Sequence, residues 1–179
     1  MALTSTIHLF DIDLADSDRH VYESLSLRVA RHPSESEDYL VTRVLAYALE
    51  YAPGIEFSRG LSDPEEPAIT IRDPTGALEA WIDVGSPDAA RLHKAAKAAP
   101  RVAVYMHKDP SQYLARLEGA RIHRAAAIAL WSVDRAVLST LVTHLDRRVA
   151  FSLAVTEREL FVAIGAVTVT GALTRRVLD

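Results

Sequence analysis

The chain has 179 residues, of which 49% are hydrophobic and 25% are charged, an ordinary composition for a globular protein. It contains no cysteine, which excludes disulfides and thiolate metal sites such as zinc ribbons. The net charge of −4 argues against a protein that coats nucleic acid through bulk charge, but it leaves room for a local basic cleft. We expect one domain over residues 1–179, long enough to fold without a disulfide or structural metal.

The first 18 residues carry four aspartates and no basic residue. A secretory signal peptide needs a basic start followed by an apolar run, and this segment has neither. The longest apolar stretches of the chain are much shorter than a membrane span. The sequence therefore predicts a soluble, cytoplasmic protein that does not enter the membrane.

Alternating and helical periodicities predict an α/β order of elements. Residues 7–14 and 21–29 are predicted strands, and the turn-forming Ala-Asp-Ser-Asp between them predicts an N-terminal antiparallel hairpin. Ser34, followed three residues later by Glu37, has the form of a capping box that begins a helix. Its apolar face extends to about residue 51, and a Pro-Gly dipeptide then ends it.

The middle of the chain predicts a second hairpin and a crossover helix. Residues 67–72 and 77–84 are predicted strands, joined by an Asp-Pro-Thr-Gly with the residue preferences of a type I turn. A helix over residues 86–99 follows, with Ser as its N-cap and Pro at its first position. The next strand, residues 101–106, is expected to pair in parallel with the second hairpin strand.

The last third of the chain predicts further helices and a run of strands. Helices are expected at residues 112–117 and 134–145. The predicted strands cover residues 125–133, 149–155, 160–164 and 167–173. Together with the first two thirds, this order indicates a mixed α/β fold.

The register of the second hairpin brings two carboxylates together. If the turn pairs Asp73 with Gly76, one face is apolar throughout and the other face places Glu66 opposite Asp83. Opposite residues have Cβ atoms roughly 4.5–5.5 Å apart, so two acids there repel unless they share a cation or a proton, or diverge into solvent. Because Mg²⁺ takes one or two carboxylates with water and phosphate oxygens, the pair suggests metal-dependent chemistry on a phosphate-bearing substrate. The alternative is a frayed, solvated hairpin end.

The helix after this hairpin adds a cation. Arg91 and Lys94 lie on one polar stripe, and a lysine beside two carboxylates can orient water or stabilise charge that develops on phosphorus. The alternative for this stripe is a solvated surface. Glu35, placed in the first turn of the first long helix, is either a partner of the helix dipole or an additional carboxylate of the site. Trp81 could stack a base or simply cover the sheet beneath the helix.

Several separated motifs occur in the order of a known family and span essentially the whole chain. They are Met1-Ala2-Leu3, His32-Pro33-Ser34-Glu35, Arg43-Val44-Leu45-Ala46, Phe57-Ser58-Arg59-Gly60-Leu61, Glu66-Pro67, Trp81-Ile82-Asp83-Val84-Gly85 with Pro87-Asp88 and Arg91, and Leu130-Trp131-Ser132-Val133. In this order they resemble the YaeQ family of bacterial proteins.

The resemblance implies an outlying member of the PD-(D/E)xK, or restriction-endonuclease-like, superfamily. That fold has a mixed sheet built from a helix, a strand meander, a helix and a parallel strand; here it would carry the N-terminal hairpin and extra C-terminal antiparallel strands. The resemblance makes Glu66 and Asp83 ligands of Mg²⁺ or Mn²⁺, with Glu35 completing the catalytic site. The superfamily's in-strand lysine is absent, because Gly85 stands in its place, so Lys94 would supply the cation.

Two functions remain open at this stage. The first is a Mg²⁺- or Mn²⁺-dependent phosphodiesterase that acts on nucleic acid. The second is a non-catalytic module that binds nucleic acid or protein and has kept the fold while losing nuclease activity. The net acidity and the Gly85 substitution favour the second function.

Overall fold

The chain folds as a mixed α/β protein around one large sheet; this computed structural model describes residues 4–58 and 65–179. Within the described residues there are ten strands, four α-helices and one short 3₁₀-helix. They are β1 (Thr6–Asp16), β2 (Val21–Arg31), α1 (Glu37–Glu50), β3 (Ile55–Phe57), β4 (Ile69–Arg72), β5 (Leu78–Val84), α2 (Ala89–Ala98), β6 (Arg101–Met106), α3 (Pro110–Leu117), η1 (Ala125–Ala127), β7 (Ala129–Val133), α4 (Arg135–Thr143), β8 (Arg148–Thr156), β9 (Glu159–Ile164) and β10 (Val167–Arg176).

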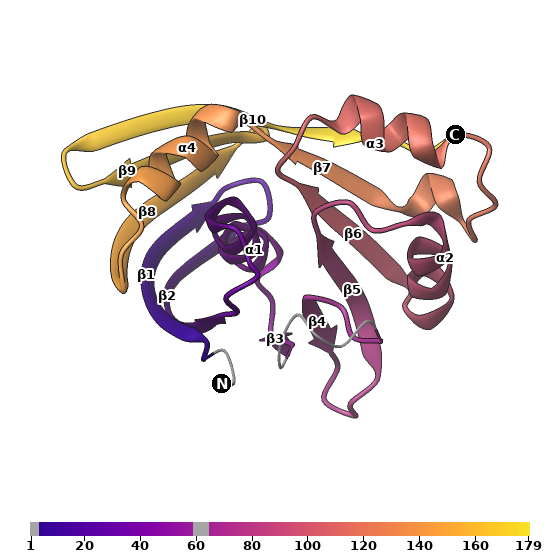
Figure 1. Ribbon diagram of the computed structural model, residues 1–179. Helices are drawn as coiled ribbons and strands as arrows, with labels where there is room; N and C mark the ends of the chain where they lie inside the picture. Colours follow the sequence, from indigo (N-terminus) through magenta and orange to yellow (C-terminus); the bar gives the residue numbers. More distant parts are fainter. Residues whose placement is uncertain (1–3, 59–64) are drawn as a thin grey trace.

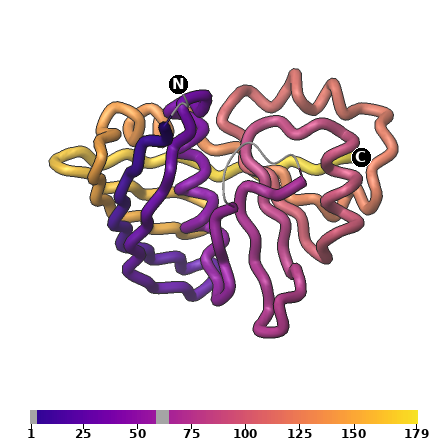
Figure 2. The backbone as a smooth tube through the Cα atoms, turned by 60° about the horizontal axis from the view of Figure 1, so that its bottom comes forward, coloured from indigo at the N-terminus to yellow at the C-terminus, as the bar shows by residue number. Residues whose placement is uncertain are grey.

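The sheet has the strand order β2-β1-β8-β9-β10-β7-β6-β5-β4-β3. The predicted N-terminal hairpin, the parallel pairing of β5 with β6 and the C-terminal antiparallel strands are all confirmed. β10 joins the two halves of the sheet, because its first part pairs with β9 and its last part pairs with β7. Figure 2 shows the first hairpin beside β8 and β9, well away from the β4–β5 hairpin. The C-terminal strands therefore extend the sheet.

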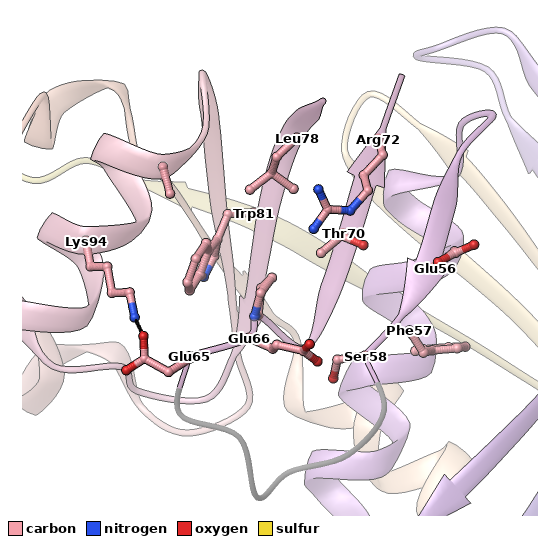
Figure 3. Close-up of a pocket in the computed structure, with 12 residues that line it drawn as sticks. Glu56, Phe57, Ser58, Glu65, Glu66, Thr70, Arg72, Leu78, Trp81 and Lys94 are labelled. Atoms are coloured by element: carbon pink, nitrogen blue, oxygen red, sulfur yellow. Dashed lines mark hydrogen bonds and ion pairs between the residues drawn. The ribbon is translucent and has the colours of Figure 1, made fainter. Parts of the chain in front are cut away.

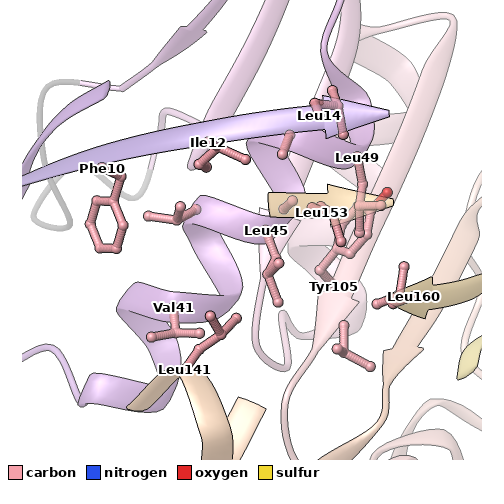
Figure 4. Packing of buried hydrophobic residues seen from close by; sticks show 14 of the residues in the cluster. Phe10, Ile12, Leu14, Val41, Leu45, Leu49, Tyr105, Leu141, Leu153 and Leu160 are labelled. Atoms are coloured by element: carbon pink, nitrogen blue, oxygen red, sulfur yellow. The ribbon is translucent and has the colours of Figure 1, made fainter. Parts of the chain in front are cut away.

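Helices cover both faces of this sheet. The sheet arches around α1 (Figure 1), and α1 and α4 share one hydrophobic core with residues of both sheet halves. On the other face of β5, β6 and β7, a second core is formed with α2 and α3. Figure 4 shows the larger core, where Phe10, Ile12 and Leu14 of β1 lie along α1, which carries Val41, Leu45 and Leu49. None of the described helices is long and apolar enough to cross a membrane.

Three predicted element starts are wrong. The N-cap of α1 is Ser36, whose Oγ accepts from the Tyr39 amide at 3.0 Å, while the Ser34 hydroxyl lies 2.6 Å from a ring nitrogen of His32. The N-cap of α2 is Asp88, because a carboxylate is a strong acceptor at a helix start. The strand expected from residue 125 begins only after η1.

Candidate functional site

The register of the β4–β5 hairpin differs from the prediction by two residues. Ile69 pairs with Ile82, and Thr70 with Trp81. The predicted turn forms, since the Gly76 amide donates to the Asp73 carbonyl. However, Gly76 is left-handed and adds one unpaired residue to the β5 side of the hairpin. An irregularity between Ile71 and Arg72 adds a second one. A shift of two residues keeps Ile69, Ile71, Ala80 and Ile82 on their predicted face. Leu78 is the exception: it lies beyond the irregularity and joins Trp81 on the groove face.

The expected cross-strand pair of Glu66 and Asp83 is therefore wrong. Glu66 lies in a bend before β4, and its side chain is exposed. The backbone amide of Ala68, just before β4, donates to Asp83 Oδ1 at 3.4 Å. The two carboxylates do not face each other across the hairpin.

Asp83 is instead bound by an arginine from α2. Arg91 Nε lies 2.7 Å from Oδ2 and Nη2 lies 2.9 Å from Oδ1, so the guanidinium contacts both carboxylate oxygens. The Asp83 side chain is only 5% exposed. The hydrogen bond to Asp83 raises the pKa of Arg91 above its ordinary value, so the guanidinium stays charged. The guanidinium also stacks over the ring of Trp81, 5.5 Å from its centroid.

Arg91 and Lys94 hold the segment before β4 against α2. Arg91 Nη2 donates to the Glu66 carbonyl oxygen at 2.7 Å. One turn later, Lys94 forms an ion pair with Glu65 (Figure 3), while the Glu66 side chain turns away from Lys94 toward Ser58. The polar stripe of α2 thus contacts acidic residues, as expected, but Lys94 contacts Glu65 and not a predicted site carboxylate.

Glu35 belongs to a separate buried ion pair. It precedes the N-cap Ser36, so it lies outside the first turn of α1 where it was predicted. Its Oε2 lies 3.3 Å from Arg43 Nη2, and both side chains are at most 4% exposed. Arg43 also donates to the Ala30 carbonyl at 2.8 Å. Because of these contacts, Glu35 joins the start of α1 to β2.

Tyr39 lies between the two ion pairs. Burial raises the pKa of the Tyr39 hydroxyl to about 12, and the charges of Arg43, Glu35, Asp83 and Arg91 all act on it, in that order of size. His107 packs edge-on against the Tyr39 ring, with the ring centroids 6.2 Å apart. Its pKa is lowered by burial, so a neutral imidazole is favoured beside the tyrosine. Tyr39 and His107 thus place aromatic side chains between the Glu35–Arg43 and Asp83–Arg91 ion pairs.

We expect the raised pKa of Tyr39 to weaken the fold in alkali. The free tyrosine pKa is about 10, so between pH 10 and 12 the unfolded chain loses this proton more readily than the folded chain. The stabilisation is complete below pH 10 and is lost as pH rises toward 12. Urea unfolding at pH 8 and pH 10.5 should show a smaller alkaline loss for Tyr39→Phe than for the wild type. Tyr22→Phe, at a 61% exposed position, is the control; equal losses in both variants would contradict the prediction.

A groove of about 650 Å³ runs over β4, β5 and α2 beside these residues. Its apolar part includes Phe57, Leu78 and Trp81, whose indole is 3% exposed. Trp81 therefore mainly covers the sheet beneath α2, which was the simpler of its two interpretations. Among residues 4–58 and 65–179, the charged residues on the groove wall are Glu56, Glu65, Glu66, Arg72 and Lys94, three carboxylates against two cations.

The described residues do not form a fitting site for Mg²⁺ or Mn²⁺. Among residues 4–58 and 65–179, no three His, Cys, Asp or Glu side chains gather around one point. Both oxygens of Asp83 are bonded to Arg91, and Glu35 is paired with Arg43. A divalent cation that approached Asp83 or Glu35 would be repelled by the guanidinium charge of Arg91 or Arg43 already bound there. The arrangement at the end of β5 is that of a fixed ion pair.

The sequence placed Arg91 and Lys94 on one stripe of the helix, but the role of the cation was assigned to Lys94 and not to Arg91. The signal was available, because the first turn of a crossover helix lies next to the end of the strand that precedes it, and Arg91 is three residues after the N-cap Asp88. Arginine is also the residue that matches both oxygens of a carboxylate at once. No pattern in the sequence indicated that Tyr39 would lie near both ion pairs.

Comparison with known proteins agrees with this architecture. The YaeQ protein family matches residues 1–172. This chain belongs to the YaeQ family. YaeQ proteins of Escherichia coli K12 and Salmonella typhi, both called uncharacterized, are 32% and 31% identical to it, over 82% of each chain.

Two crystal structures of YaeQ proteins are also similar to the chain. The protein from Xanthomonas axonopodis pv. citri superposes with a TM-score of 0.88 at 29% identity, over 98% of this chain and all of the other. The Pseudomonas syringae protein gives 0.85 at 30% identity, over 96% of this chain and 95% of the other. The ten-stranded arrangement is thus a property that the chain shares with YaeQ proteins along nearly its whole length.

Proposed function

We propose that this chain is a non-catalytic binding module built on a restriction-endonuclease-like fold, with a protein segment as its partner. The order of elements supports the fold assignment. α1 is followed by the antiparallel meander β3–β4–β5, and α2 then leads to β6, which is parallel to β5. This is the helix, meander, helix and parallel strand that the superfamily implies. The remaining strands all continue the sheet beyond β6, because β3 is an edge strand.

The ion pair of Asp83 with Arg91 carries the argument against catalysis. In a metal-dependent phosphodiesterase this aspartate would accept a divalent ion, whereas here a guanidinium already contacts both of its oxygens. The two other predicted acids are also elsewhere, since Glu66 is exposed in a bend and Glu35 is paired with Arg43. The site thus has the charge pairing of a structural contact.

The charge of the groove favours a protein partner over nucleic acid. A phosphate backbone is bound through several lysines and arginines, but the described residues of this groove include more carboxylates than cations, in a chain of net charge −4. Its apolar wall and its glutamates suit an extended peptide that carries lysine or arginine. Glu56 and Glu66 are the side chains we assign to that contact.

We expect Mn²⁺ titrated into the protein to give no saturable heat in calorimetry. Gel assays with Mn²⁺ and labelled single- and double-stranded DNA or RNA should show no cleavage, because Asp83 offers no free oxygen to the ion. Anisotropy of the same labelled oligonucleotides at physiological salt should stay at the value of the free probe. Mn²⁺ binding that Asp83→Asn abolishes, or cleavage that Glu66→Gln abolishes, would overturn the proposal.

Binding of a protein segment to the groove is tested with an array of short peptides of varied charge. Peptides that contain lysine or arginine should bind best, and the double variant Glu56→Gln/Glu66→Gln should weaken them by about tenfold or more. Glu79→Gln is the matched control, since Glu79 is an exposed residue of β5 that does not line the groove. If acidic and basic peptides bind alike, the assignment of the partner is wrong.

A further inference from the structure

A second cavity, of about 480 Å³, lies between the two halves of the sheet at the end of α1. Its walls come from segments far apart in the sequence: the β1–β2 turn, the last turn of α1, the start of β6, β7, the β8–β9 turn and the end of β10. A cavity of this size is in the range that holds small molecules. It lies apart from the groove over Trp81, with no lining residue in common.

The β8–β9 turn places Arg158 in this cavity through an unusual backbone. Glu157 and Arg158 have φ values of 50° and 60°, the left-handed region that residues with a side chain rarely adopt. Asp18 holds both residues there, because its carboxylate accepts the two backbone amides at 2.7 and 2.9 Å. The Arg158 carbonyl in turn accepts from Leu173 at 2.8 Å. The strained turn thus fixes the point from which the arginine side chain extends.

Two arginines of this cavity have no carboxylate partner among the described residues. Arg19 pairs with Asp16 at 2.8 Å, and Arg101 pairs with Glu50 at 2.6 Å. Glu50 also accepts from the fully buried Tyr105 hydroxyl, so its carboxylate is already satisfied. Arg158 and Arg175 form no ion pair within residues 4–58 and 65–179. The cavity is lined by four arginines and three acids (Asp16, Asp18 and Glu50), which leaves one net positive charge, and Arg158 and Arg175 are its two cations without an ion pair among the described residues.

Both of these cations border the indole of Trp131. Arg175 is the cross-strand partner of Trp131 on β10, and the Arg158 guanidinium lies 5.3 Å from the centroid of an indole ring. Ala127 and Ala129, on the approach to Trp131, leave space above the sheet. Two guanidinium groups provide the paired donors that bind a phosphate, and a planar group can stack on an indole or a guanidinium plane.

We propose that this cavity binds a small phosphorylated ligand of the nucleotide class. Arg158 and Arg175 hold the phosphate, and the base lies against Trp131 over the alanine floor. The proposal is independent of the peptide groove, since it uses other residues on another part of the sheet. The negative charge of the whole protein does not oppose it, because the uncompensated charge inside the cavity is positive.

The test is calorimetric titration of the full chain with AMP, adenosine and inorganic phosphate. AMP should bind saturably, and more tightly than either adenosine or phosphate. Arg158→Gln and Arg175→Gln should each weaken AMP by about tenfold or more, the loss expected for a charge-assisted hydrogen bond. Trp131→Leu should weaken AMP while leaving the affinity for phosphate unchanged.

Arg176→Gln is the matched control for Arg175→Gln. Arg176 is the next residue of β10 and is also exposed, but it points to the opposite face of the sheet, so its loss should leave AMP affinity unchanged. Arg158→Asn removes the guanidinium with a residue that tolerates the left-handed turn, and it separates lost binding from lost folding. AMP binding that survives both Arg158→Asn and Arg175→Gln, or equal affinity for AMP and phosphate, would overturn the proposal.

Discussion

Arg91→Met is expected to lower the free energy of unfolding by about 3–5 kcal/mol, the cost of leaving a buried charge without its partner. The Asp83 side chain is 5% exposed, so water cannot replace the two hydrogen bonds that Arg91 supplies. The change also removes the donor to the Glu66 carbonyl and the stacking over Trp81. Urea unfolding followed by circular dichroism measures this loss.

Three further variants separate the ion pair from its surroundings. Asp83→Asn alone should cost less than Arg91→Met, because Arg91 is 25% exposed and can still be hydrated. Adding Asp83→Leu to Arg91→Met should recover part of the stability, since an apolar pair replaces the lone carboxylate. Lys94→Met is the control on the same helix stripe; its exposed ion pair with Glu65 contributes about 1 kcal/mol or less. Equal losses for Arg91→Met and Lys94→Met would show that Asp83 is not the buried partner.

Gly54→Ala is expected to destabilise the fold by about 2–5 kcal/mol, the sum of a left-handed backbone and a steric clash. Gly54 has φ 88°, and a Cβ built on it would lie 2.0 Å from the Arg72 carbonyl oxygen. That contact is with backbone, so no side chain can turn aside to relieve it. Strand β4 would have to move away from the end of α1. The midpoint of thermal or urea unfolding measures the effect.

Gly76→Ala isolates the steric part of this loss. Gly76 has nearly the same backbone, with φ 89°, but nothing lies within 4 Å of the position of its Cβ. It should therefore cost only the left-handed strain, about 1–2 kcal/mol. If the two variants lose the same stability, the approach of β4 to Gly54 is not as close as described here.

The amino-acid pattern was enough to predict the elements but not the register that joins them. The faces of β4 and of β5 from Ala80 onward were predicted correctly, because side chains alternate between the two faces of a strand and Ile69, Ile71, Ala80 and Ile82 are all apolar. A bulge adds residues without changing the hydrophobic pattern, and two added residues restore the same faces. For this reason the pairing of Glu66 with Asp83 looked self-consistent and was still wrong.

The sequence predicted which segments form the candidate site, but the contacts predicted between their side chains were wrong. Asp83, Glu66 and the α2 stripe do come together, through Arg91 and its bond to the Glu66 carbonyl. Whether Asp83 binds a metal ion or an arginine depends on which side chain of another element contacts it in the folded protein. Spacing within one hairpin or one helix does not specify that contact. The pairing of Glu35 with Arg43 was hidden for the same reason, because it depends on the packing of α1 against β2.

Because β1 pairs in parallel with β8, the central part of the sheet can form only late in the synthesis of the chain. Leu9 pairs with Arg148, so the inner edge of the first hairpin has no partner until most of the chain has left the ribosome. Closing so long a loop costs chain entropy before any contact repays it, which slows folding. Until then a strand edge is open to other nascent chains. The last strands to be made therefore shield the first from aggregation, and a chain that stops before β8 leaves that edge bare.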